Sequence, residues 1–190
     1  MPFTIRPAQY EDAEAIAHVQ VESWKTTYAG IVPQAFLDTF DIPQRIPKWH
    51  DLLSTPNSPI FVAQDKDPTS TIVGFISGGP TREQSVPPDA PRYDAELYAV
   101  YLLESSQRHG LGRTLTQTLA AALNQQGFQS LLVQVLEQNP AVTFYQHLGA
   151  VEIARTTIHI GGADLPELTL AWPSLAPLLP SRTEQPNPIA

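Results

Sequence analysis

The chain has 190 residues and a formal net charge of −8, with 11 Lys and Arg against 19 Asp and Glu. Its length suits one domain with a sizeable core, and its acidic balance argues against nucleic acid as a partner, because binding to phosphate backbones depends on clustered Lys and Arg. The lack of cysteine excludes disulfides and thiolate chemistry. Since we also find no signal peptide and no long apolar run, we expect a cytoplasmic protein without a membrane partner.

The N-terminal half predicts a strand, a long helix, two short helices and a pair of strands. Their expected ranges are residues 3–6, 10–28, 34–40, 43–53, 60–64 and 71–78. Apolar residues recur at spacings of three and four through the long helix, which indicates one buried face. Trp24 and Tyr28 lie at the end of this face, where they either pack in the core or contact a substrate. Residues 79–92 contain four prolines and are expected to form an exposed loop.

The most informative stretch runs from residue 95 to residue 120. Residues 96–103 are rich in aliphatic and aromatic side chains, which is typical of a strand. A helix follows, whose apolar stripe is Leu111, Leu115, Leu119 and Leu123. Between strand and helix, Gly110 and Gly112 allow close approach to the backbone, and the first helical turn leaves N–H groups unpaired. This arrangement is either a plain turn or an anion site suited to a phosphate or pyrophosphate.

A second motif follows the apolar strand predicted at residues 130–136. Asn139 is a good N-cap, Pro140 suits the first helical position, and Gly149 fits the left-handed residue that ends a helix. Residues 151–160 and 165–172 are expected to form a hairpin around a Gly-Gly turn. We therefore expect a single domain over residues 1–172. Five prolines in residues 173–190 predict a C-terminal tail that is mobile or lies over the surface.

The order and spacing of these motifs resemble the GNAT superfamily of acyl-CoA-dependent N-acyltransferases. The residues that carry the resemblance are Gln107-x-x-Gly110-x-Gly112, Asn139, Phe144-Tyr145, Leu148-Gly149 and the segment SWKTTYAGIVPQAFLDTF. The likeness covers about residues 3–172. It implies an α/β fold, with a mixed, mostly antiparallel sheet of about seven strands flanked by helices. The strands that contain Leu102 and Leu132 are expected to splay apart.

The resemblance implies acetyl-CoA as cosubstrate, a primary amine as acceptor, and no metal. The scattered histidines fit this, since none forms the i, i+4 pair typical of a zinc site. The expected cofactor-binding residues are Val100, Leu102, Gln107, Arg108, His109, Gly110, Leu111, Gly112, Arg113, Thr114 and Asn139. Tyr145 matches the general acid that protonates the leaving thiolate. Glu96 lies six residues, or about 20 Å, before Leu102 and matches the general base. Tyr98 shares a strand face with Glu96, and is expected to contact the acceptor together with Trp24 and Tyr28.

Each role has a structural alternative. Glu96 would instead pair with an arginine, Tyr98 and Tyr145 would pack in the core, and Asn139 would only cap its helix. Three functions remain: acetylation of a small amine, acetylation of a peptide N-terminus or lysine, and acyl-CoA sensing without turnover. The presence of both Glu96 and Tyr145 counts against the sensor. A homodimer is possible because homodimers are common in the superfamily, although no patch assigns an interface.

Overall fold

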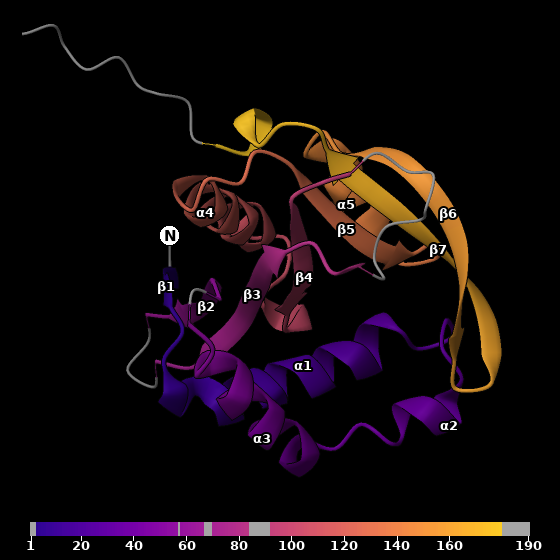
Figure 1. Ribbon diagram of the computed structural model, residues 1–190. Coiled ribbons are helices and arrows are strands. Elements are labelled where there is room, and N and C mark those ends of the chain that lie inside the picture. Colours follow the sequence, from indigo (N-terminus) through magenta and orange to yellow (C-terminus); the bar gives the residue numbers. More distant parts are fainter. Residues whose placement is uncertain (1–2, 57, 67–69, 84–91, 180–190) are drawn as a thin grey trace, which may run out of the picture.

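The computed structural model describes residues 3–56, 58–66, 70–83 and 92–179 (Figure 1). In this part of the chain one sheet has the strand order β1-β2-β3-β4-β5-β7-β6. The strands are β1 (Phe3–Pro7), β2 (Ile60–Asp65), β3 (Ile72–Pro80), β4 (Ala95–Leu102), β5 (Leu131–Leu136), β6 (Val151–Ile160) and β7 (Ala163–Trp172). Only β4 and β5 run parallel, and every other neighbouring pair is antiparallel. The predicted mixed, mostly antiparallel sheet is confirmed.

Helices cover both faces of the sheet (Figure 1). They are η1 (Tyr10–Asp12), α1 (Ala13–Thr27), α2 (Gln34–Leu37), α3 (Ile42–Leu53), η3 (Glu104–Ser106), α4 (Leu111–Gln125), α5 (Ala141–His147) and η4 (Ala176–Leu178). α1 and α3 pack on one face, and α4 and α5 on the other. The apolar stripe predicted for α4 is buried along its whole length. Within the described ranges, no helix combines the length and apolarity needed to cross a bilayer.

Most predicted boundaries agree with the structure to within two residues, and three differences are informative. The helix predicted at 34–40 is only the four residues of α2, and the helix predicted at 10–28 begins with the 3-10 turn η1. β3 continues through Gly79 to Pro80, two residues into the predicted loop, because these residues pair with Glu96 and Ala95 of β4. A proline is tolerated there because it ends the strand and need not donate a ladder hydrogen bond. Residues 84–91 of the predicted loop lie outside the described residues.

The sheet is split between β4 and β5. These strands pair only where Ala95–Leu97 meets Leu131–Val133. Beyond that point they diverge, so the predicted splay is present. A β-bulge accompanies the divergence, since Ser77 pairs with Ala99 and Gly78 with Leu97, which leaves Tyr98 as the extra residue. Bulges bend a strand and increase its twist, and this one lies where β4 and β5 part.

An apolar cluster joins the two halves of the sheet at the open end of the splay. Tyr28 and Leu37 from the α1–α2 region pack with Leu136 of β5. The β6–β7 turn also approaches α2: a Cβ atom on Gly161 would lie 2.5 Å from Cβ of Phe36, and Gly161 has a φ of +59°. A larger residue at this turn would therefore both clash and be strained.

The start of the predicted C-terminal tail packs on the domain. Leu175 and Leu178 are each 1% exposed and belong to the core cluster beneath α4. Proline at residue 177 lies in the short helix η4 rather than in a free segment. The packed region thus extends past Trp172 to Leu179, and residues 180–190 lie outside the described residues.

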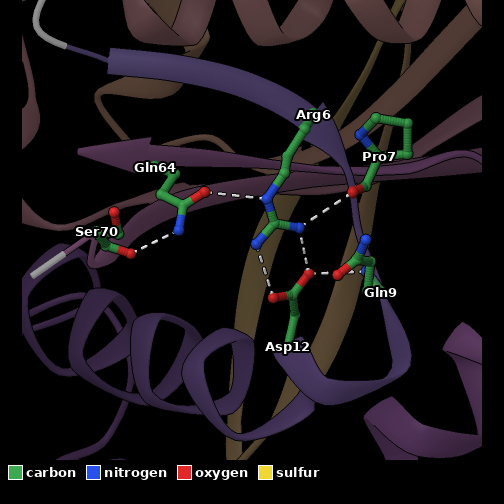
Figure 2. Close-up of polar contacts among 6 residues, drawn as sticks. All are labelled: Arg6, Pro7, Gln9, Asp12, Gln64 and Ser70. Atoms are coloured by element: carbon green, nitrogen blue, oxygen red, sulfur yellow. Dashed lines mark hydrogen bonds and ion pairs between the residues drawn. The ribbon is translucent and has the colours of Figure 1, made fainter. Parts of the chain in front are cut away.

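A polar network fastens β1 to η1 and β2 (Figure 2). The guanidinium of Arg6 donates two hydrogen bonds to Asp12, at 2.7 and 2.9 Å, and a third to Gln64 at 3.0 Å. Asp12 also accepts the backbone N–H of Gln9 at 2.7 Å, while Gln64 donates to the carbonyl of Ser70. Burial alone would raise the pKa of the Asp12 carboxyl, but these hydrogen bonds and the Arg6 charge hold it below its ordinary value.

Candidate active site

A cavity of about 850 Å³ occupies the splay between β4 and β5. β4 lines it from Leu97 to Leu102, and β5 lines it from Val133 to Val135. The predicted site residues that line it are Tyr28, Tyr98, Val100, Leu102, Gln107, Arg108, Gly110, Gly112, Arg113, Asn139 and Tyr145. The predicted residues absent from the lining are Trp24, Glu96, His109, Leu111 and Thr114.

The glycine loop at the start of α4 presents a row of unpaired donors. Arg108 and Gly110 both have left-handed backbone, with φ of +62° and +78°. Among the described residues, no acceptor pairs with the backbone N–H groups of residues 108–113, and no side chain caps α4. These groups lie at the positive end of the helix dipole, so the loop is suited to an anion. A Cβ on Gly110 would meet nothing within 4 Å, which leaves the backbone open to a ligand.

Gly112 has a second role in packing. A Cβ atom there would lie 3.3 Å from Cζ of Phe144 and 3.8 Å from Cδ1 of Leu102. The missing side chain therefore lets α5 approach the start of α4. This contact sets the distance between the loop and the helix that carries Tyr145.

Other residues of the loop contribute through their backbone. The His109 ring packs edge-on against Phe3, with ring centroids 5.9 Å apart. Leu111 is a core residue, and the Thr114 hydroxyl donates to the Gly110 carbonyl at 3.2 Å. On β4, the Leu102 carbonyl accepts hydrogen bonds from the side chains of Ser23 and Gln107, both at 3.2 Å. Since the chain's own side chains occupy that carbonyl, Val100 is left as the better β4 partner for a bound chain.

Tyr145 is a free hydroxyl donor in the cavity wall. Its ring is 5% exposed and packs edge-on against Trp172, with centroids 6.0 Å apart. No described residue hydrogen-bonds to the Tyr145 hydroxyl. Burial, and next the nearby Tyr28, raise the pKa of Tyr145 well above its ordinary value. At neutral pH the residue is therefore a protonated donor.

Asn139 connects α5 to α1. Its Oδ1 accepts the backbone N–H of Ala141 at 2.9 Å, so the side chain caps α5, which begins one residue later than predicted. Its Nδ2 donates to the Tyr28 hydroxyl at 3.3 Å. Burial raises the pKa of Tyr28, although the Tyr101 hydroxyl and Asn139 act in the opposite direction. Tyr28 and Tyr101 interact electrostatically, without a hydrogen bond of normal geometry between them.

Glu96 is fully buried and paired with an arginine. The backbone N–H of Arg82 donates to Glu96 Oε2 at 3.0 Å, and Nε of Arg82 lies 3.1 and 3.2 Å from the two carboxylate oxygens. Nη2 of Arg82 also contacts Oε1. Arg82 lies over the Tyr98 ring at 4.8 Å, so Glu96 and Tyr98 share one neighbour, as their predicted common face requires. Glu96 therefore forms a pair with an arginine, which was the structural alternative to the role of general base. Both of its carboxylate oxygens accept hydrogen bonds from Arg82.

The sequence profile of the "Acetyltransferase (GNAT) family" matches residues 19–150. The chain is also 41% identical over 175 residues to the uncharacterized N-acetyltransferase YuaI of Bacillus subtilis strain 168, across 92% of this chain and 95% of YuaI. The chain belongs to the GNAT acetyltransferase family. It is therefore an acyltransferase by family.

Solved structures share the fold of this GNAT protein. The PaiA N-acetyltransferase of Thermoplasma acidophilum, in complex with coenzyme A, aligns with a TM-score of 0.61 and 21% identity over 88% of this chain and 98% of PaiA. YncA of Salmonella typhimurium, with its cofactor acetyl-CoA, aligns with a TM-score of 0.65 and 20% identity over 100% of both chains. At this level of identity the likeness concerns the fold alone.

Trp24, a predicted acceptor contact, packs in the apolar cluster at the open end of the splay. Its ring stacks on Phe40 with centroids 4.2 Å apart, and it lies tilted at 45° to the Tyr28 ring at 4.5 Å. Its Nε1 is buried without a hydrogen bond to any described residue. These contacts correspond to core packing, which was the alternative to a substrate contact for Trp24. Tyr28, one helical turn on, is the residue of this pair that reaches the cavity.

Three residues in or beside the cavity were not predicted from the sequence. Tyr101 lines the cavity, but the bulge at Tyr98 shifts the strand alternation, so that Tyr101 and Ala99 pack with one core cluster and Leu97 with the other. Arg82 lies in the proline-rich segment, where no periodicity marks it. Glu167 of β7 interacts electrostatically with Glu96 and Arg82, and burial raises the pKa of its carboxyl. The only feature of the sequence that could have pointed to Glu167 is that it is a lone charged residue within the strand predicted at residues 165–172.

Proposed function

We propose that this protein transfers an acetyl group from acetyl-CoA to a primary amine. One observation carries the proposal: a single cavity connects the unpaired N–H groups before α4 to the free hydroxyl of Tyr145. An anion site and a buried proton donor in one cavity are the two features that thioester transfer from a CoA carrier requires. The GNAT family and CoA-bound neighbours of the same fold support it.

The residues of the cavity fit the cosubstrate. The backbone of residues 108–113 would hold the pyrophosphate, with the side chains of Arg108 and Arg113 adding positive charge. Beyond Leu97, no described strand pairs with β4 on the β5 side, so the β4 backbone near Val100 can pair with the pantetheine amides. Asn139 lies in the opposite wall. Held in this way, the thioester lies toward the closed end of the splay.

Acetyl-CoA supplies the thioester when bound, and the protein's residues handle position and protons. The amine nitrogen forms a bond to the acetyl carbon, the C–S bond breaks, and the sulfur keeps the electron pair. Tyr145 donates its hydroxyl proton to that sulfur. The amine gives up one proton, for which we propose Glu96 as the acceptor through a water molecule. Because Arg82 occupies the carboxylate oxygens, this role requires one of those contacts to open during turnover.

The test is acetyl-CoA-dependent thiol release over a panel of amines, polyamines, amino acids and short peptides. The protein has no cysteine, so a thiol-reactive dye gives no background from the chain. We expect Tyr145→Phe to lower kcat by about 100-fold or more, the usual contribution of a general acid. Its melting temperature should not change, since the hydroxyl makes no hydrogen bond to a described residue. Tyr10→Phe, at an exposed tyrosine stacked on His50, is the matched control and should keep full activity.

Two results would contradict the proposal. The first is full activity of Tyr145→Phe, which would remove the general-acid role of Tyr145 and with it the observation that carries the proposal. The second is an absence of both turnover and any rise in melting temperature with acetyl-CoA. The acceptors that the panel identifies decide between small amines and peptides as the substrate class. A homodimer, a cytoplasmic location and independence from metals also stay predictions.

A further inference from the structure

Arg82 is anchored along one edge and free along the other. Its Nε and Nη2 face the buried carboxylate of Glu96, and its guanidinium carbon lies 4.8 Å from the centre of the Tyr98 ring. Yet 47% of the Arg82 side chain is exposed. Nη1 makes no hydrogen bond or ion pair with any described residue. A structural arginine that only neutralised Glu96 would need no exposed donor edge.

The Tyr98 ring, over which Arg82 lies, is at the closed end of the splay. Tyr98 lines the cavity, is 36% exposed, and is fixed by a hydrogen bond of 2.6 Å from its hydroxyl to the Pro80 carbonyl. It directly follows Leu97, the last β4 residue that pairs with β5. This is the end toward which the thioester is directed in the proposed function. Arg82 does not itself line the cavity, but it lies over the Tyr98 ring, which does. An acceptor nitrogen must come within about 3.5 Å of the thioester carbon, so we expect groups a few bonds from that nitrogen to reach Arg82 across this ring.

The charges around Arg82 match a substrate with both signs. Among the described residues, Glu96 and Glu167 are the two carboxyl groups that interact with it, so this part of the cluster holds one guanidinium and two carboxyls. An ammonium group approaching this end is attracted to the carboxyls. A carboxylate on the same molecule is attracted to the free edge of Arg82. A guanidinium held flat by a carboxylate and an aromatic ring is preorganised for such an oxyanion.

We propose that Arg82 is a specificity-determining residue, which selects acceptor amines that carry a carboxylate a few bonds from the amine. The inference rests on the proposed function and names the acceptor class, amino acids and their close analogues. Glu96 and Tyr98 hold the guanidinium in place, and Glu167 adds attraction for the ammonium.

The experiment compares acceptors that differ by one group. kcat/KM is measured for a set of amino acids, their α-amides and their decarboxylated amines. We expect the carboxylate to raise kcat/KM by about 10-fold to 100-fold, the effect of one or two charge-assisted hydrogen bonds. Arg82→Gln should bring the ratio of amino acid to amide close to one, and Arg82→Lys should retain part of it. Arg155→Gln, at an exposed arginine paired with Glu137 and Glu152, is the control and should leave the ratio unchanged.

The comparison on the native protein needs no variant, so a poorly folded Arg82→Gln does not decide the outcome. Equal kcat/KM for amino acid, amide and amine would overturn the inference while leaving the acetyltransferase intact. The same holds if Arg82→Gln lowers all three rates by one common factor, since that indicates a purely structural arginine. If no amine is acetylated, the proposed function fails and the inference fails with it.

Discussion

Removing Arg82 should destabilise the fold more than removing the carboxylate it pairs with. Glu96 is 0% exposed, and Arg82→Gln would leave it with the backbone N–H of residue 82 as its remaining donor. An uncompensated buried charge costs about 3–5 kcal/mol. Because Arg82 is half exposed, solvent already screens the pair, and we expect about 3 kcal/mol. Glu96→Gln leaves Arg82 free to be hydrated at its exposed edge, so its cost should be about 1 kcal/mol.

Urea unfolding at pH 7 measures both costs, and a double variant measures their coupling. The double variant should be more stable than Arg82→Gln alone, because it no longer buries a charge. Arg155→Gln serves as the exposed control. If Arg82→Gln costs no more than Glu96→Gln, Glu96 is not held as a buried anion. Activity separates the two roles of Glu96. If Glu96 is the general base, Glu96→Gln should lose kcat while Arg82→Gln keeps it. If Glu96 only orients Arg82, both variants should lose the selectivity for acceptors with a carboxylate to the same extent.

Three further predictions concern the loop, the polar network and the tail. Gly110→Ala should cost about 1 kcal/mol and raise KM for acetyl-CoA, because alanine resists a φ of +78°, while Gly110→Asn should be milder in both assays. Asp12→Asn should lower the free energy of unfolding by about 2 kcal/mol at pH 7. Since the folded pKa of Asp12 is depressed, the native advantage is present above its unfolded pKa and is lost as pH falls below about 4, which urea unfolding at several pH values checks. Leu178→Ala should cost about 3 kcal/mol in the same assay, and Leu52→Ala, at an exposed leucine, much less.

The parts of this protein that depend on neighbouring residues could be predicted from its sequence. Leu111 and Leu115 predicted the buried face of α4 because helical periodicity acts over a few residues. Gly149 and Asn139 were assigned correctly for the same reason, since a left-handed turn and a helix cap depend on the local backbone. The splay was predicted from the family resemblance rather than from the strands themselves.

The parts that depend on register could not be predicted. Arg82 meets Glu96 across 14 residues of chain, and only the β3–β4 pairing brings them together. Tyr101 was hidden by the bulge at Tyr98, which no local pattern marks. The prolines of the C-terminal segment predicted a tail. Leu175 and Leu178, three residues apart, could have indicated that the start of this segment packs on the core.

The apolar cluster at the open end of the splay has a consequence for how a ligand enters. The two halves of the sheet are tied at the closed end by three residue pairs and at the open end by Leu136 and the contact of Phe36 with Gly161. A gap tied at both ends has a set width before anything fills it. We therefore expect binding without a preceding opening step, so that affinity is not reduced by the population of an open state. The β6–β7 turn at Gly161 would thereby help to set the width of the cavity in which we propose that acetyl transfer takes place.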